Sequence, residues 1–103
     1  MIERHWKGVT QPLEADNYAR HLMNETFQKL KVMTGFIRAS ILTRPVDEGV
    51  EFLIVTVWES LENIKEFTGE DISVAVVPDK VKQMMVRFDE TATHYQVERY
   101  FES

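Results

Sequence analysis

The sequence contains no cysteine among its 103 residues. Disulfide bonds and thiolate metal sites are therefore excluded, and the absence fits a reducing compartment. No apolar stretch approaches the roughly 20 residues that cross a bilayer. The N-terminus is charged from Glu3 onward and lacks the apolar core of a signal peptide. We therefore expect a cytoplasmic protein with no membrane partner.

Basic residues are also few: the chain has 12 Lys and Arg and 17 Asp and Glu, which gives a formal net charge of −5. Nucleic acids and anionic membranes are bound by basic surfaces, so neither is expected as a partner. The sequence has no Gly-rich nucleotide loop, no HExxH, no GxSxG and no EF-hand loop, and its three histidines lack metal-ligand spacing. No metal site is expected.

Gly and Pro occur singly, with no linker or repeat, which predicts one domain over residues 1–103. Hydrophobic periodicity predicts the following elements: a strand over 2–10, a helix over 14–33, strands over 36–43 and 50–59 joined by a turn at 44–49, a short helix from 61 that Ser60 caps and Gly69 ends, a helix from Pro78 to Phe88, and a strand over 93–101. This order predicts the α+β class and a ferredoxin-like βαββαβ fold, with helices on one face of a four-stranded antiparallel sheet.

The third strand is apolar on both faces, with Phe52, Ile54 and Trp58 on one and Leu53, Val55 and Val57 on the other. Helices from a chain of this length cover one face of the sheet, so the other face needs a partner. A two-fold homodimer is the simplest solution, with Val55 and Ile41 as candidates for its interface.

Three aromatic side chains and two arginines are candidates for binding a small ligand. Trp58, at the end of the third strand, can wall a pocket and offer its ring to an aromatic ligand, although core packing is the alternative. Trp6 has the same two interpretations, and Phe67 lies on the inner edge of the short helix. Arg4 and Arg38 lie on strands and can bind an anionic group, the alternative being edge charges or ion pairs.

Two histidines, His5 and His94, lie on strands that neighbour each other in this topology. They can approach across the sheet and share a site, or form separate hydrogen bonds. His21 falls on the polar side of the first helix and is expected to be exposed. Asp89 is expected in a loop, with a possible hydrogen bond to His94.

Four segments resemble the antibiotic biosynthesis monooxygenase-like family of dimeric α+β barrels. They are Ile2-Glu3-Arg4-His5-Trp6, Met33-Thr34-Gly35-Phe36, the strand-to-helix junction from Val55 to Asn63, and His94-Tyr95-Gln96-Val97. The resemblance covers almost the whole chain and implies a dimeric α/β barrel. It also implies an oxygenase that works without flavin or metal on a small aromatic or polycyclic phenol or quinol, and hence no cofactor.

The resemblance also implies roles for particular residues. Trp58 matches the family's pocket tryptophan, and His5 or His94 would serve as base or hydrogen-bond donor beside it. Arg4, Trp6, Arg38 and Phe67 would contact the substrate. The haem-degrading branch needs a histidine that residues 64–77 lack, and a strand-one asparagine where this chain has Arg4 or His5, so haem degradation is not expected. A non-catalytic ligand-binding or structural dimer is the alternative function.

Overall fold

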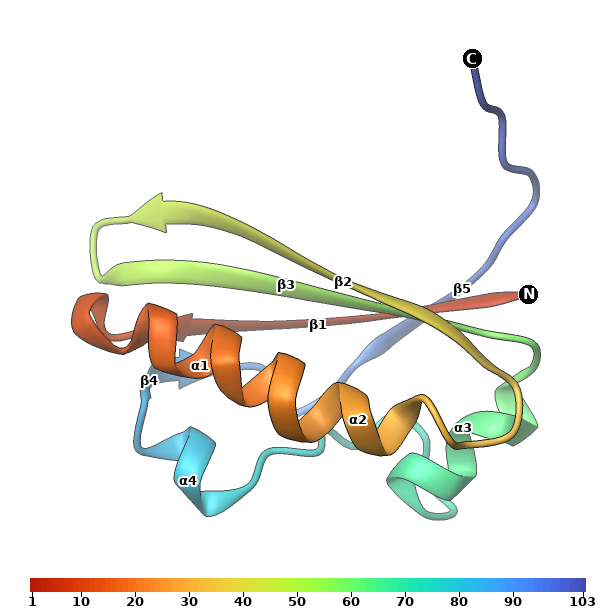
Figure 1. Ribbon diagram of the computed structural model, residues 1–103, viewed down its shortest axis with the longest axis horizontal. Coiled ribbons are helices and arrows are strands. Elements are labelled where there is room, and N and C mark those ends of the chain that lie inside the picture. The colour runs from red at the N-terminus through yellow and green to blue at the C-terminus, as the bar shows by residue number, and fades with distance from the viewer.

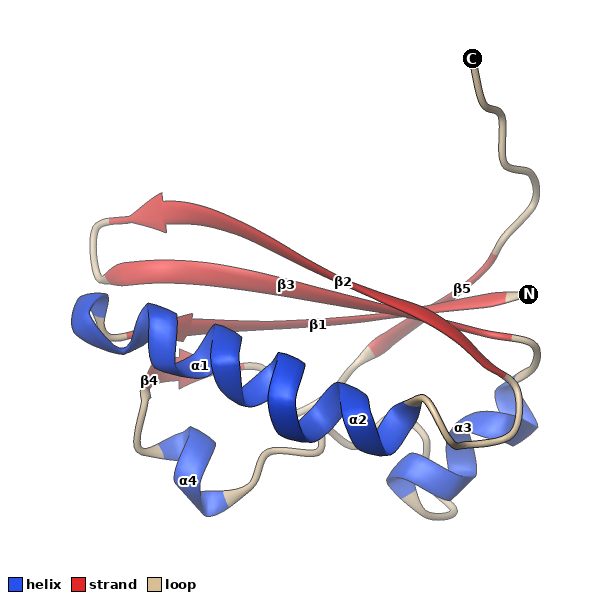
Figure 2. Cartoon of the chain, in the orientation of Figure 1, coloured by secondary structure: helices blue, strands red, loops and turns tan.

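The central strand of the molecule is β1 (Ile2–Thr10). In this computed structural model, which describes residues 1–103, β1 pairs along its whole length with β3 (Gly49–Trp58), which in turn pairs with β2 (Phe36–Val46). The other edge of β1 is shared by β4 (Met85–Phe88) near its end and β5 (Thr93–Gln96) near its start. All pairs are antiparallel, and the sheet of the single chain is open (Figure 2).

The helices lie together on one face of this sheet (Figure 1). A continuous helical segment runs from the 3₁₀ turn η1 (Pro12–Glu14) through α1 (Ala15–His21) and the π-helical turn η2 (Leu22–Thr26) to α2 (Phe27–Leu30). Helix α3 (Leu61–Thr68) follows β3, and α4 (Asp79–Lys82) precedes β4. Because successive strand residues point to opposite faces, every second side chain of β1 and β3 faces these helices.

The inner face of the sheet carries two apolar clusters. One joins β3 to α1 and α4 through Tyr18, Leu22, Phe52, Ile54, Val81 and Met85. The other, formed by Ile2, Leu30, Trp58 and Ile64, fixes α2 and α3. Burial of each large side chain stabilises the fold by about 1.5–3 kcal/mol. Arg4 and Thr56 are register partners on the same face, between the two clusters, and both are buried.

The ferredoxin-like α+β plan predicted from the sequence is confirmed, although the antiparallel sheet has five strands rather than four, because β4 and β5 share one edge of β1. The Ser60 cap is also confirmed, since its hydroxyl accepts from the Asn63 backbone N–H at 3.3 Å. The predicted helix from Pro78 to Phe88 is wrong in its second half. Helix α4 ends at Lys82, and Met85 begins strand β4. The end of β1 offers unpaired backbone groups there, and pairing with them outweighs the helical pattern of the side chains.

The last predicted strand, 93–101, is too long, because β5 ends at Gln96. Its partner runs out at this point: Gln96 pairs with Ile2, and the Val97 N–H donates to the Met1 carbonyl at 2.9 Å. Residues 97–103 then leave the sheet on the side opposite the helices (Figure 1). No helix has the length and apolar character needed to cross a bilayer.

The outer face of the sheet, away from the helices, carries Leu53, Val55 and Val57 of β3 and Leu42 of β2, which pairs with Leu53. Leu42 keeps 47% of its surface exposed. Ile41 points the other way, since it packs against the inner cluster of Tyr18 and Phe52. The expectation that Ile41 lies on the partner-facing side is therefore wrong. On β2 the outer face is occupied by Ser40 and Leu42, and Ile41, which lies between them and pairs with Ile54, points to the inner face.

Candidate functional site

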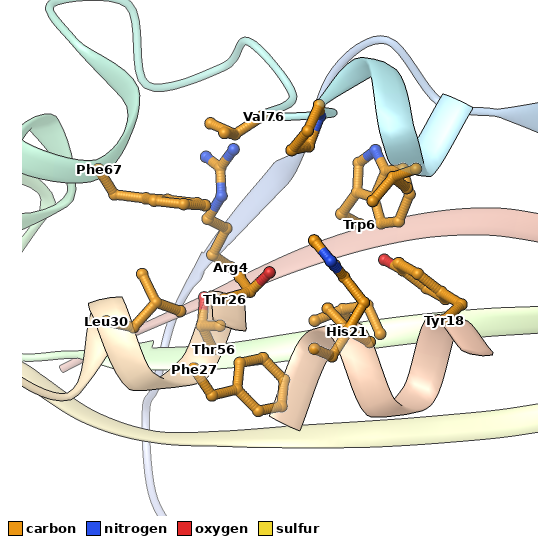
Figure 3. A pocket seen from close by; sticks show the side chains of 14 residues that line it. Arg4, Trp6, Tyr18, His21, Thr26, Phe27, Leu30, Thr56, Phe67 and Val76 are labelled. Atoms are coloured by element: carbon orange, nitrogen blue, oxygen red, sulfur yellow. The ribbon is translucent and has the colours of Figure 1, made fainter. Parts of the chain in front are cut away.

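A cavity of about 60 Å³ lies between the two apolar clusters, under the helical segment and beside α4. The sheet contributes Arg4, Trp6, Ile54 and Thr56 to its wall. The helices and the loop before α4 supply the rest, namely Tyr18, His21, Leu22, Thr26, Phe27, Leu30, Phe67, Val76, Pro78 and Val81 (Figure 3). Most of this lining is apolar, and a few polar groups converge on it, which is typical of small-molecule sites.

The π-helical turn η2 forms part of the cavity wall. It starts at Leu22, directly after His21, and ends at Thr26, and all three of these residues line the cavity. A π turn takes one more residue per turn than an α-helix, so the side chains on either side of it are rotated relative to each other. Such turns are frequent at functional sites.

Arg4 is the one positive charge in the wall of the cavity. Its Nη1 donates to the carbonyl of Ile72 and lies 2.9 Å from Nε2 of His94, and its Nη2 donates to the carbonyl of Val74 at 2.9 Å. A guanidinium has five N–H donors, so two remain uncommitted. The guanidinium also lies over the ring of Phe67, 5.7 Å from its centroid.

The charge of Arg4 has no partner of opposite sign. Arg4 belongs to none of the ion pairs of the molecule, and only 4% of its surface is exposed. Burial lowers the pKa of Arg4 to about 10, so the guanidinium stays protonated at neutral pH. Buried charges are normally paired, which makes this site favourable for an anionic group.

The three histidines occupy three different surroundings. His94 accepts a hydrogen bond from Arg4 on the inner face, and burial together with the Arg4 charge lowers the pKa of His94. On β1 the residue that pairs with His94 is Arg4, and His5 is the next residue along the strand. His5 points to the outer face, where its Nε2 lies 2.9 Å from a Glu3 carboxylate oxygen. Adjacent residues of a strand face opposite sides, so the structure does not form a shared His5–His94 site.

The third histidine, His21, is 8% exposed and lines the cavity, so the expectation of a surface residue is wrong. On the same helical segment Tyr18 and Leu22 are buried with His21, whereas Met23 is 53% exposed. The sequence did contain a signal for this site, since Glu25 follows His21 at the four-residue spacing that places both on one helical face.

Trp6 and Phe67, both predicted to contact the substrate, line the cavity, and so do the aromatic side chains of Tyr18 and Phe27. Trp58 does not line it. Its surface is fully buried, its indole N–H donates to Thr56 Oγ1 at 2.9 Å, and Phe67 stacks on it at 6.4 Å between ring centroids. Contact between Trp58 and a ligand therefore requires Phe67 to move.

Arg38 lies away from the cavity, because it pairs with Val57 on the outer face and is exposed there. Its guanidinium lies 5.1 Å from the ring centroid of Tyr100 in the C-terminal tail. Asp89 does not bind His94; its backbone carbonyl accepts from the Trp6 indole N–H at 2.7 Å. Of the predicted site residues, the structure thus gathers Arg4, Trp6 and Phe67 around one cavity, with His94 behind Arg4.

The residues present do not fit a haem group. The cavity of about 60 Å³ is far smaller than a tetrapyrrole, and the stretch 64–77 beside it contains no histidine. No group of three or more His, Cys, Asp or Glu side chains is arranged to hold a metal ion.

Comparison with known proteins finds neither a matching family model nor a curated protein of similar sequence. Solved structures do match. A Bacillus cereus protein assigned to the antibiotic biosynthesis monooxygenases superimposes with a TM-score of 0.66 at 17% identity, covering 99% of this chain and 95% of that one. A Deinococcus radiodurans protein with the same assignment gives 0.63 at 15% identity, covering 100% and 98%.

A third structure, a point mutant of MhuD with two manganese protoporphyrin IX molecules bound per active site, gives a TM-score of 0.64 at 15% identity, with both chains covered in full. Identities this low establish the fold. The chain therefore has the ferredoxin-like α+β fold of the antibiotic biosynthesis monooxygenases.

Proposed function

We propose that the protein is a cofactor-independent monooxygenase-like enzyme acting on a small aromatic phenol or quinol. The observation that carries this proposal is the buried, unpaired guanidinium of Arg4 in the wall of an otherwise largely apolar cavity. An ionised phenol combines an apolar ring with one negative oxygen, and both parts find a counterpart here. Trp6 and Phe67 offer aromatic surface to the ring, and Arg4 offers two free N–H groups to the oxygen.

The chemistry needs no further reductant. A phenolate is electron-rich and passes electrons to dioxygen; one oxygen atom becomes the second oxygen of a quinone, and the other leaves as water with the two hydrogens that the phenol loses. The contribution of the protein is to hold the anion, exclude water and orient the ring. Arg4 stabilises the phenolate, and His94 positions Arg4 by accepting one of its N–H groups.

Admission of such a substrate requires the cavity to expand. An apolar cavity of roughly 150 Å³ accommodates benzene, whereas this one measures about 60 Å³. Its wall shares five residues with a hollow at the surface between the helical segment and the loop before α4: His21, Thr26, Phe67, Val76 and Pro78. We propose that Phe67 and this loop move outward to admit the ring, which would also open a path to Trp58.

A second candidate function is a non-catalytic ligand-binding or structural dimer, which the burial of Trp58 beneath Phe67 favours. Oxygen consumption separates the two. Purified protein is mixed with a panel of phenols and quinols in air, and oxygen uptake is followed with an electrode. If the protein is an enzyme, we expect uptake that Arg4→Met abolishes and that Arg20→Met, a matched change at an exposed arginine of α1, preserves. Binding of phenols without oxygen uptake would favour the second function.

We propose in both cases that the outer face of the sheet binds a second copy of this chain. Leu42, Leu53 and Val55 are apolar side chains of this face that no helix covers. The face also carries charges of both signs, Glu3 and Glu51 against Lys7, Arg38 and Arg44, which suits self-association about a two-fold axis. His5 and Arg38 would lie in this interface. The absence of cysteine supports a cytoplasmic location.

A further inference from the structure

A chain of three charged or titratable side chains reaches from the surface into the cavity. Lys80 of α4 donates to Oε2 of Glu25 at 2.8 Å, and the same carboxylate oxygen lies 3.1 Å from Nδ1 of His21. Glu25 is half exposed, whereas His21 is 8% exposed and lines the cavity. The Lys80 ammonium, followed by the His21 contact, holds the pKa of Glu25 below its usual range, so the carboxylate is ionised at neutral pH.

The ionised Glu25 determines which nitrogen of His21 carries the proton. A carboxylate accepts hydrogen bonds and cannot donate them, so Nδ1 of His21 must be the protonated nitrogen. In the neutral imidazole, Nε2 then has a free lone pair. Nε2 of His21 has no hydrogen-bond partner in the protein. Every fully buried side-chain nitrogen or oxygen in the molecule does have a partner. Nε2 is therefore not fully buried, and His21 lines both the cavity and the adjoining surface hollow.

We propose that His21 accepts the proton of the substrate hydroxyl group, with Glu25 as the positioning residue that fixes its tautomer. This inference rests on the proposed function and assigns its base. The O–H bond of the phenol breaks, its electron pair stays on the oxygen facing Arg4, and the proton moves to Nε2. The resulting imidazolium keeps its Nδ1–H on Glu25, whose negative charge stabilises it.

The surroundings of His21 support this assignment. Arg4 of β1 brings a positive charge to the cavity wall, which favours the phenolate. Tyr18 stacks on His21 at 6.5 Å between ring centroids, and burial raises the pKa of Tyr18, so its hydroxyl stays neutral and can donate to the anion. Lys29, at the mouth, lies in the surface hollow that His21 also borders.

The other histidines do not suit the role. His94 Nε2 is already occupied by the Arg4 N–H, and His94 does not line the cavity. His5 lies on the opposite face of the sheet. His21 is the histidine with a free nitrogen at the cavity.

The test uses 4-nitrophenol, whose yellow phenolate reports ionisation directly, and benzoate, an aromatic anion with no proton to transfer at neutral pH. Binding of each probe to the intact protein is measured by calorimetry, the ionised fraction of bound 4-nitrophenol by absorbance, and proton release with a pH indicator in weak buffer. The variants are His21→Gln and Glu25→Gln. Glu62→Gln is the matched control, since Glu62 also holds a lysine, Lys65, but on the exposed surface of α3.

In the wild-type protein and in Glu62→Gln, we expect bound 4-nitrophenol to be yellow at a pH below its own pKa, without net proton release. In His21→Gln the ratio of bound phenolate to bound phenol should fall about tenfold or more, one pKa unit, or each phenolate formed should release a proton to the solvent. Benzoate affinity should stay within about twofold, which shows that the site is intact. In Glu25→Gln the ratio of bound phenolate to bound phenol should lie between the ratios of the wild type and His21→Gln. Nitrogen NMR spectra of this variant should show that the Nδ1–H tautomer of His21 is lost.

Equal ionisation and equal proton release in wild type and His21→Gln would overturn the role of His21 while leaving the proposed function standing. Failure of both probes to bind the wild-type protein would instead refute the proposed function, and this inference with it.

Discussion

The guanidinium of Arg4 and the imidazole of His94 face each other across the β1–β5 pair, with Nη1 2.9 Å from Nε2. Since a guanidinium has no acceptor atom, His94 Nε2 must be the acceptor and must be unprotonated. The contact therefore links the protonation state of His94 to the position of the buried cation, and through Val74 and Ile72 to the loop that closes the cavity.

This contact predicts how stability depends on pH. Burial, and then the Arg4 charge, lower the pKa of His94 in the folded protein below its ordinary value of 6.5. As the pH falls through that value, the unfolded chain binds a proton before the folded one does, so the free energy of unfolding decreases until the folded pKa is passed. Urea denaturation between about pH 7.5 and pH 5 should show this decrease. In His94→Gln, which keeps an acceptor but does not titrate, the decrease should be smaller; an identical pH dependence would contradict the assignment.

Arg4→Met should lower the free energy of unfolding by about 2–3 kcal/mol, because it leaves the carbonyls of Ile72 and Val74 without their donors. Hydrogen exchange should accelerate first in the segment 72–78. Arg20→Met is the control, since Arg20 is an exposed arginine on α1; such surface changes usually stay within about 0.5 kcal/mol. Equal effects of the two substitutions, measured by urea denaturation, would show that the buried contacts contribute little.

Val55→Glu should prevent association of the chain. Val55 faces outward between Ser40 and His5, so a carboxylate there would be buried in the proposed dimer interface. An obligate interface usually exceeds about 2,000 Å², and each Å² of apolar area contributes roughly 25 cal/mol. Sedimentation at micromolar concentration should give a dimer for wild type and a monomer or aggregate for the variant. Val32→Glu, at a position 79% exposed on another part of the surface, should remain dimeric. A stable wild-type monomer would refute the dimer.

Haem should not bind as a histidine-ligated complex. The cavity is too small for it, and the stretch 64–77 beside the cavity contains no histidine. Titration with haem is expected to give no sharp Soret band at one haem per chain. If such a band forms and His21→Ala removes it, the cavity opens much further than the proposed admission of a single ring requires.

The sequence by itself determined the order of the elements from β1 to α3 and the two-faced character of the strands. Alternation in residues 2–10 and 50–59, the Ser60 cap and the stops at Gly35 and Gly69 are local signals, and each depends on side-chain spacing or backbone conformation within a few residues. These signals sufficed to place Arg4 and Trp58 on strands and to predict an outer apolar face.

Only the tertiary structure decided which polar side chains meet. Strand β4 arose where a helix was predicted, because the free edge of β1 supplied backbone partners that no local pattern reveals. His5 and His94 were separated by strand alternation and register, Trp58 was covered by Phe67, and the packing of the helical segment on the sheet turned His21 inward. Each of these outcomes depends on contacts between residues far apart in the chain, and the free energy of such contacts is set by the packed fold rather than by any one segment.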